Sequence, residues 1–498
     1  MVRRRTVPII LLALLSVLPT PASAHELGGS RFDAPIPLSL LFAGAAATVA
    51  FTAVLLGVLS DPDTTVEPMS GAPTGTTGPS EPTATTRTSG VTPGTEPPTA
   101  STRRRFATVP APFARALRPL VRSVFFLLFL GAIVTGLFGT QVAAESLATT
   151  FVWPVWLKGI GLCAIAVGSP WRVLSPWRTL YAGLRRLEGG EIALLGAYPD
   201  WLGRWPALGG FLLWIGVLEN LTIVPQSPRS TAVVIAGYAL LMLGGSIAFG
   251  PAWLRNADAL EVFYRLLGRV APIRPRRVDD GGVRLTLRAP WDGCMHPVAD
   301  LSLVAFAIAA VYTVSFDGFT STPEFQRVLF DARDLIGIGG EVSVLLYLGG
   351  LFGFVGLFLA ISWVMGAIVD AGSGWREVAC GFAPTVLPIA AAYELTHNYP
   401  FVLRNLGVSL AQLASIATST SVAPIAILDW LTVEFFWGSQ VLLIVLGHVI
   451  AVVAAHRVAL ARTETAGQAR RMHASLVVLM VGYTVLSLWI VSRPIATG

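Results

Sequence analysis

Charged residues are scarce in this chain of 498 residues. Only 13% of the residues are Asp, Glu, Lys or Arg, about half of the share in a soluble globular domain. The hydrophobic residues, 54% of the chain, fall in runs of about 20, the length that crosses a bilayer as a helix. The sequence therefore predicts an all-α, polytopic transmembrane helical bundle. It excludes a soluble, a disulfide-rich or a largely disordered protein.

Lysine and cysteine are almost missing. Of the 35 basic residues, 34 are arginines and one is Lys158. The three cysteines are too few and too scattered for a disulfide framework or a CxxC metal site. The sequence also contains no P-loop, no HExxH and no GxSxG motif. These absences argue against ATP-driven transport by this chain alone and against most familiar hydrolase designs.

The N-terminal region predicts a secretion signal, one helix and a linker. Residues 1–24 combine three arginines, a short apolar run and a small-residue cleavage site, which is typical of a signal peptide; a retained anchor is the alternative. Residues 25–36 are then a short extracytoplasmic N-terminus, and 37–59 the first transmembrane helix. Residues 60–121 are predicted to be a cytoplasmic linker, because 31 of the residues in 60–102 are Thr, Pro, Ser or Gly and the remainder is basic.

Nine further apolar segments predict a nine-helix transmembrane bundle over residues 122–493, about ten spans in all. One orientation places 25 arginines in cytoplasmic loops and six on the opposite side, so the positive-inside rule decides it. We expect a multi-pass protein of the cell membrane with both mature termini extracytoplasmic. The arginines then need no nucleic acid to explain them. The cytoplasmic loop 251–298 is predicted to hold an amphipathic helix over 257–270 and a hairpin over 278–287.

Ionisable side chains at membrane depth are candidate functional residues, because each costs several kcal/mol unless it is paired or hydrated. The candidates are Glu219, Glu394, His397 and His448, with Asp317 at a helix end. Glu219 is either a coupling carboxylate or a solvated group near the outer interface. For Lys158 the ordinary expectation is a side chain that reaches the outer headgroups.

Metal binding is a second hypothesis for the histidines. Glu394 and His397 stand three residues apart and share a helical face, a spacing that carboxylate metal bundles use. The alternative is a hydrated helix end with an internal Glu–His hydrogen bond. His448 could ligate a metal, relay protons or bond to a neighbouring backbone. If cleavage follows Ala24, the free amine and imidazole of His25 could chelate a transition metal.

Several short phrases together resemble a family of uncharacterised polytopic membrane proteins, mostly actinobacterial. The resemblance spans nearly the whole chain except 60–105 and lies in Ala24–Gly29, Asp33–Pro37, Ser175–Arg178, Arg255–Ala259, Ser315–Phe319 and Gly447–Val449. Some members are designated fenitrothion hydrolases, which implies metal-dependent hydrolysis with Asp317, His397 and His448 at the family's recurring polar positions. The chain departs from that pattern at Glu394, where the family is usually apolar.

Three functions follow from the sequence. The first is a transporter or channel-like permease for a small molecule or ion, which uses the sparse intramembrane Glu and His residues. The second is a membrane-embedded metal-dependent hydrolase, for which Asp317, His397 and His448 would have to converge across helices. The third is a scaffold or assembly protein that binds a protein partner through loop 251–298. The lipid bilayer is the one partner that all three share.

Overall fold

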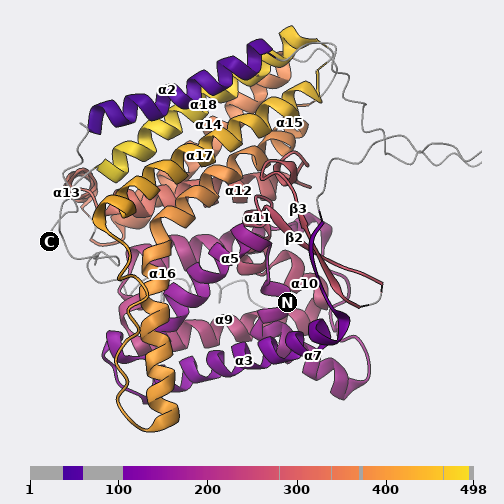
Figure 1. Ribbon diagram of the computed structural model, residues 1–498, viewed down its shortest axis with the longest axis vertical. Coiled ribbons are helices and arrows are strands. Elements are labelled where there is room, and N and C mark those ends of the chain that lie inside the picture. The colour runs from indigo at the N-terminus through magenta and orange to yellow at the C-terminus, as the bar shows by residue number, and fades with distance from the viewer. Residues whose placement is uncertain are drawn as a thin grey trace, which may run out of the picture.

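The computed structural model describes residues 38–59, 105–279, 281–337, 339–368, 374–463 and 465–492. The predicted signal peptide, His25 and most of the predicted linker lie outside these residues. The described part is dominated by helices, as the composition predicts, and they form two adjoining groups (Figure 1). The all-α expectation is therefore confirmed.

The first group comprises the helices in the N-terminal half of the chain, in the lower part of Figure 1. Its membrane helices are α3 (Ala111–Phe138), the continuous run α4–η2–α5 (Leu147–Val167), the run α8–η4 (Trp205–Glu219) and α9 (Pro228–Phe249). Shorter helices gather at one end: α6 (Trp171–Leu174), α7 (Pro176–Glu188), α10 (Pro251–Asn256) and α11 (Ala259–Leu267). The predicted helix over 257–270 is thus a shorter one, because the Asp258 side chain caps α11 by accepting from the Leu260 N–H.

The second group comprises the helices in the C-terminal half of the chain. It contains α12 (Leu301–Thr320), α13 (Pro323–Ile336), α14 (Val342–Ile368), α15 (Trp375–Phe382), η7 (Ala383–Val386), α16 (Leu387–Thr418), α17 (Val433–Leu460) and α18 (Ala466–Ser492). Helix α2 (Leu38–Leu59), although first in the chain, packs against α17 and α18 (Figure 1). Helices α12 and α16 face the first group, where they contact η4, η2 and α5.

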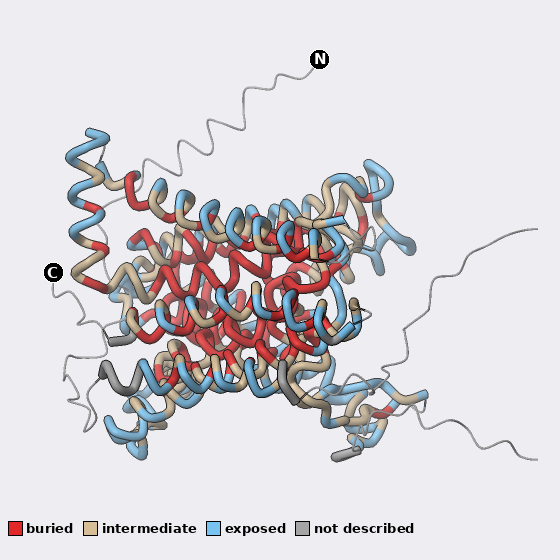
Figure 2. The backbone as a smooth tube through the Cα atoms, turned by 90° about the horizontal axis from the view of Figure 1, so that it is seen from above, coloured by how far each residue is buried: buried red, intermediate tan, exposed pale blue. Residues whose placement is uncertain are grey.

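The helices are apolar on the outside as well as in the core. Figure 2 shows the buried residues in the middle of the helix array. Large apolar side chains on its periphery are well exposed, among them Leu127, Leu240, Phe352, Leu442 and Val478. An exposed apolar belt of this kind is the surface that lipid covers. Nine helical runs in the described part are long and apolar enough to cross a membrane, and in α2 the stretch Ala43–Leu56 is a shorter candidate. These nine candidate spans fit a multi-pass membrane protein, and the tenth span stays a prediction.

A small antiparallel sheet lies beyond the helix ends. Its strands β1 (Arg105–Val109), β3 (Val283–Leu287) and β2 (Ile273–Arg277) pair in that order. The predicted hairpin therefore exists, but its first strand precedes residue 278. The end of the predicted linker is structured. Strand β1 forms there because it pairs with β3. Helix α3 begins at Ala111, several turns before the predicted start of the apolar span.

Helix α16 is longer than the bilayer requires. Its 32 residues measure about 48 Å if straight, against a hydrocarbon core of about 30 Å. The far part of α16 is held by hydrogen bonds to the segment after α3: Ser409 donates to the Thr150 carbonyl at 3.1 Å, and Gln412 donates to the Ala144 carbonyl at 3.1 Å. Residues 407–414 are thus part of α16, which runs along one side of the first group (Figure 1).

Candidate functional site

Lys158 lies inside the protein, and the expectation that it reaches the lipid headgroups is wrong. The residue is only 4% exposed. Its Nζ lies 3.1 Å from Oε1 of Glu219 and 3.9 Å from Oε1 of Glu394. A buried ammonium group must be paired, and the two carboxylates provide that pairing. The only lysine of the chain is therefore the centre of a charge cluster rather than an interfacial anchor.

Two π-helical segments carry the charges in the first group of helices. Lys158 is the last residue of η2 (Phe151–Lys158), and Glu219 is the last residue of η4 (Leu212–Glu219). Each segment is eight residues long, which is unusual, because π-helices are rare and mostly single turns at functional sites. In η2 the internal Pro154 lacks an N–H and cannot keep the α-helical ladder. The part of the bundle around Lys158 and Glu219 thus differs from ordinary α-helical spans in its backbone.

Helix α16 brings two more ionisable groups to the same place. Glu394 is 1% exposed and pairs with Lys158. His397 stands three residues later on the same helical face, and its Nε2 lies 3.1 Å from Oδ2 of Asp317 on α12. The His397 side chain is 31% exposed and that of Asp317 is 10% exposed, so this pair lies at the edge of the buried region. The expected internal Glu–His hydrogen bond is replaced by contacts across helices.

These five residues, Lys158, Glu219, Asp317, Glu394 and His397, form what we call the ion-pair cluster. It joins the two groups of helices, because Lys158 and Glu219 belong to the first group and the other three to the second. One ammonium faces three carboxylates, which leaves a formal charge of −2 with neutral His397 and −1 with protonated His397. Apart from the ion pairs with Lys158, the oxygens of Glu219 and Glu394 accept no hydrogen bond from described groups. Buried carboxylates with unused acceptor capacity favour uptake of a proton or a cation.

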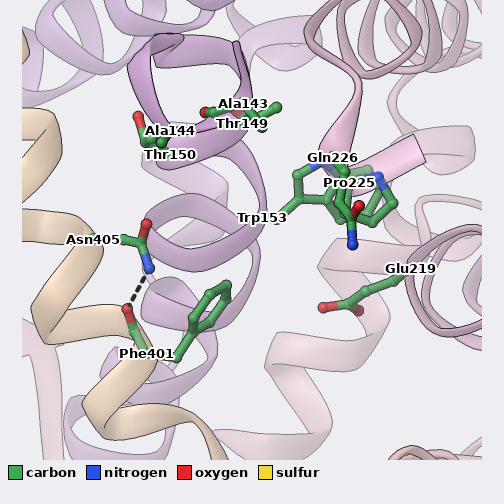
Figure 3. Close-up of a pocket in the computed structure, with 10 residues that line it drawn as sticks. All are labelled: Ala143, Ala144, Thr149, Thr150, Trp153, Glu219, Pro225, Gln226, Phe401 and Asn405. Atoms are coloured by element: carbon green, nitrogen blue, oxygen red, sulfur yellow. Dashed lines mark hydrogen bonds between the residues drawn. The ribbon is translucent and has the colours of Figure 1, made fainter. Parts of the chain in front are cut away.

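A cavity of about 190 Å³ leads to the cluster. Glu219 lines it on the same side as Gln226 and Pro225, across from Asn405 and Phe401 of α16 (Figure 3). The other lining residues come from the segment after α3 and from η2: Ala143, Ala144, Thr149, Thr150 and Trp153. The Asn405 amide donates to the Phe401 carbonyl at 2.9 Å. Glu219 lines this cavity but is only 2% exposed, so the alternative that it is a solvated group at the interface is wrong.

The predicted metal set does not converge. No three His, Cys, Asp or Glu side chains within the described ranges lie close enough to hold one metal ion. Asp317 and His397 do meet, as the hydrolase hypothesis requires, but His448 does not complete a site with them. A catalytic zinc site needs about three protein ligands, so this pair is one ligand short. His25, the other proposed ligand, lies outside the described residues.

His448 has a structural hydrogen bond. It is fully buried, and its Nδ1 lies 2.8 Å from the carbonyl oxygen of Ile444, one turn earlier in α17. The neighbouring Gly447 packs so tightly against Pro388 and Ala392 of α16 that a Cβ there would overlap both residues. This contact supports the reading of His448 as a packed helix residue.

A second buried polar group of the first group of helices is the Asp258 side chain. The Asp258 carboxylate accepts hydrogen bonds from Nε1 of Trp171 at 2.9 Å, Nε1 of Trp177 at 2.7 Å and the Tyr238 hydroxyl at 3.1 Å. Burial raises the pKa of Asp258 to about 6, although the two indole hydrogen bonds oppose that shift. Beside it, buried Glu261 pairs with Arg172 at 2.9 Å and Arg178 at 3.7 Å.

Sequence reasoning did not identify Asp258 and assigned Lys158 the wrong environment. Asp258 and Trp177 lie 81 positions apart in the sequence, and the hydrogen bond between them follows only from the fold. For Lys158 the available signal was its uniqueness in an apolar segment that also lacks a charged neighbour in sequence. Protein-family models, curated proteins and solved structures were compared with the chain, and none matches it.

Proposed function

We propose that the protein is a membrane transporter or channel-like permease whose ion-pair cluster binds a proton or a small cation. The observation that supports this function best is the double placement of Glu219: it pairs with Lys158 inside the bundle and lines the cavity. A carboxylate so placed can exchange its lysine partner for a proton or cation that arrives through the cavity. Intramembrane ionisable residues in transporters commonly serve this role.

The position of the cluster supports a coupling role. Because its members come from both groups of helices, a change in its protonation or cation occupancy alters an attraction between them. Transporters commonly move one helix group against another around a site near the middle of the membrane. The positive-inside rule, applied to the loops of the sequence, puts the cavity mouth on the extracytoplasmic side of the cell membrane. The basic sheet then lies on the cytoplasmic side.

The cavity can be tested with charged thiol reagents in intact cells. The chain would first have Cys163, Cys294 and Cys380 replaced by alanine, and Asn405→Cys would then be added at the cavity wall. We expect Asn405→Cys to react with membrane-impermeant methanethiosulfonates, faster with the cationic than with the anionic reagent, because the cluster is negative. The matched control is His448→Cys, which is buried outside the cavity and should stay unreactive. No reaction at position 405 from either side of the membrane would contradict an aqueous cavity.

Transport itself can be tested in proteoliposomes. Proton flux would be followed with an enclosed pH-sensitive dye, and sodium flux with a radioactive tracer, under an imposed membrane potential. We expect a protein-dependent flux of one of the two ions that Glu219→Gln reduces at least tenfold. The Tyr198 hydroxyl donates to the Gly203 carbonyl rather than to a member of the cluster, so a Tyr198→Phe variant controls for reconstitution. Absence of both fluxes in the wild type would contradict a cation permease.

The hydrolase hypothesis keeps one supporting contact, the Asp317–His397 pair. It requires a metal-bound hydroxide near that pair. Hydrolysis of a nitrophenyl phosphotriester by the purified protein with added zinc, lost in His397→Ala, would support it. The resemblance to the family with hydrolase members and a protein partner at loop 251–298 stay predictions.

A further inference from the structure

The Glu219 carboxylate has acceptor capacity next to the cavity. Its Oε1 lies 3.1 Å from Nζ of Lys158, and beyond this ion pair neither of its oxygens accepts a hydrogen bond from the described part of the chain. A carboxylate has about four lone-pair sites, so one ammonium group does not saturate it. Figure 3 shows the Glu219 side chain directed toward the space that Phe401 and Asn405 border on the other side. A cation in the cavity therefore meets a charged acceptor.

Aromatic side chains line the cavity together with this carboxylate. Trp153 of η2 is 2% exposed, and its indole Nε1 donates to Oγ1 of Thr231 at 2.9 Å, which holds the ring in place. Phe401 belongs to α16, and its ring lies across the cavity from Glu219 (Figure 3). A cation over the face of an aromatic ring is attracted by the ring quadrupole, most strongly over Trp. Aromatic side chains beside a carboxylate thus suit an organic ammonium ion.

The donor set of the cavity is poor for a metal cation. Glu219 is the only acid in the lining, and no three His, Cys, Asp or Glu side chains of the described ranges could hold a metal ion. Among the other polar groups, the Thr150 hydroxyl already donates to Oε1 of Gln412 at 2.8 Å. A cation such as Ca²⁺ takes about six to eight oxygen ligands. An organic cation needs only one acceptor for its charge, because its apolar part can contact aliphatic and aromatic side chains.

Lys158 shows which kind of cation Glu219 accepts. Its side chain is a four-carbon chain that ends in a primary ammonium group, and this group meets Glu219 from within the bundle. When a second ammonium ion occupies Glu219, Lys158 keeps Glu394 as a partner, whose Oε1 lies 3.9 Å from its Nζ. The ion-pair cluster has one ammonium group for three carboxylates, so a further monovalent cation reduces its excess negative charge.

We propose that the cavity binds a small primary ammonium ion with an apolar chain, the charged group on Glu219 and the chain against Trp153 and Phe401. This inference rests on the proposed function, because it names the class of small cation that the permease takes. The volume of about 190 Å³ lies below the 300–1,000 Å³ or so of sites for drug-sized ligands, so the chain must be short. A primary alkylamine is protonated at neutral pH, as lysine is.

Binding would be measured on the purified full-length protein with radiolabelled n-butylammonium, which has the carbon chain and the charge of the lysine side chain. The competitors are unlabelled n-butylammonium, 1-butanol with the same chain but no charge, and sodium at constant ionic strength. We expect n-butylammonium to compete at least tenfold better than 1-butanol or sodium. Glu219→Gln should lose at least tenfold in affinity. The matched control is Glu394→Gln, which also removes a carboxylate partner of Lys158 but does not line the cavity, and it should lose less than threefold.

Protection of a cysteine at the cavity wall locates the bound ion. In the Asn405→Cys variant without native cysteines, saturating n-butylammonium should slow the reaction with a methanethiosulfonate at least fivefold. The same concentration of 1-butanol should leave the rate unchanged. This measurement reports occupancy of the cavity itself, because Asn405 is one of its lining residues.

The outcomes distinguish this inference from the proposed function. Equal competition by n-butylammonium and 1-butanol, an equal loss in the two Glu→Gln variants, or unprotected reaction at position 405 would each overturn the inference, even if protons or sodium ions are transported. Binding with protection but without either flux would overturn the permease and leave the binding site. Thermal melting verifies that the variants are folded. If Glu219→Gln does not fold, Phe401→Leu, which removes only the ring, should reduce the affinity at least threefold, and an unchanged affinity would overturn the inference.

Discussion

Lys158 and Glu219 each end an eight-residue π-helical segment, and their side chains meet at 3.1 Å in the interior of the bundle. The two segments lie in different membrane helices of the first group, so the same local irregularity occurs on both sides of one ion pair. A π-helical turn re-aims the residue that ends it relative to an α-helix. The ion pair thus connects two segments of rare backbone geometry through the single lysine of the chain.

The first prediction concerns the balance of charge in the ion-pair cluster. Lys158→Met removes the one ammonium from between Glu219 and Glu394 and leaves their charges uncompensated. We expect a loss of about 3–5 kcal/mol in stability, since breaking a buried ion pair from one side is strongly destabilising. Lys158→Met combined with Glu219→Gln should recover part of that loss. Thermal or denaturant unfolding in detergent measures it, and a double variant no more stable than Lys158→Met would disprove the coupling.

The second prediction concerns the different exposure of the two histidines. Diethyl pyrocarbonate should modify His397, whose side chain is about one-third exposed, at least tenfold faster than the fully buried His448. Asp317→Asn should change the rate at His397, because it weakens the contact with Oδ2. The rate at His448 should not change. Peptide mass spectrometry after timed reaction distinguishes the sites, and equal rates would mean that His448 is accessible.

Most of the fold was predictable, whereas the pairing of charges was not. Runs of apolar residues identify helices such as α14 and α17 because only about 20 such residues cross a bilayer. Hydropathy carries no information on which helix faces which, so the contact of Lys158 with Glu394, more than 200 positions away, could not be derived. Strand β1 was missed for a similar reason, since its partner β3 is far along the chain. Glu394 and His397 were correctly placed on one face, because their spacing is local.

The third prediction concerns pH and Asp258, which lies outside the membrane spans. Its pKa is raised from 3.8 to about 6 in the native state, so the folded protein binds this proton more tightly than the unfolded chain does. The contribution to stability is complete below about pH 4 and is lost as the pH rises through 6. We expect the wild type to lose about 2 kcal/mol more than Asp258→Asn between pH 4 and pH 7. Unfolding curves at several pH values measure the difference, and parallel pH profiles would contradict it.

The fourth prediction concerns the contact between the two groups of helices at Gly216. This residue lies in η4, and a Cβ added there would overlap the ring and hydroxyl of Tyr347 on α14. The Tyr347 hydroxyl is itself fixed, because it lies 2.7 Å from Oγ1 of Thr313. Gly216→Ala should therefore destabilise the protein by about 1–3 kcal/mol through overpacking. Gly244→Ala in α9, where a Cβ meets nothing within 4 Å, should be neutral or stabilising, since alanine favours a helix over glycine. Melting of both variants in one detergent decides it, and an equal effect of the two substitutions would mean that η4 and α14 are not in tight contact.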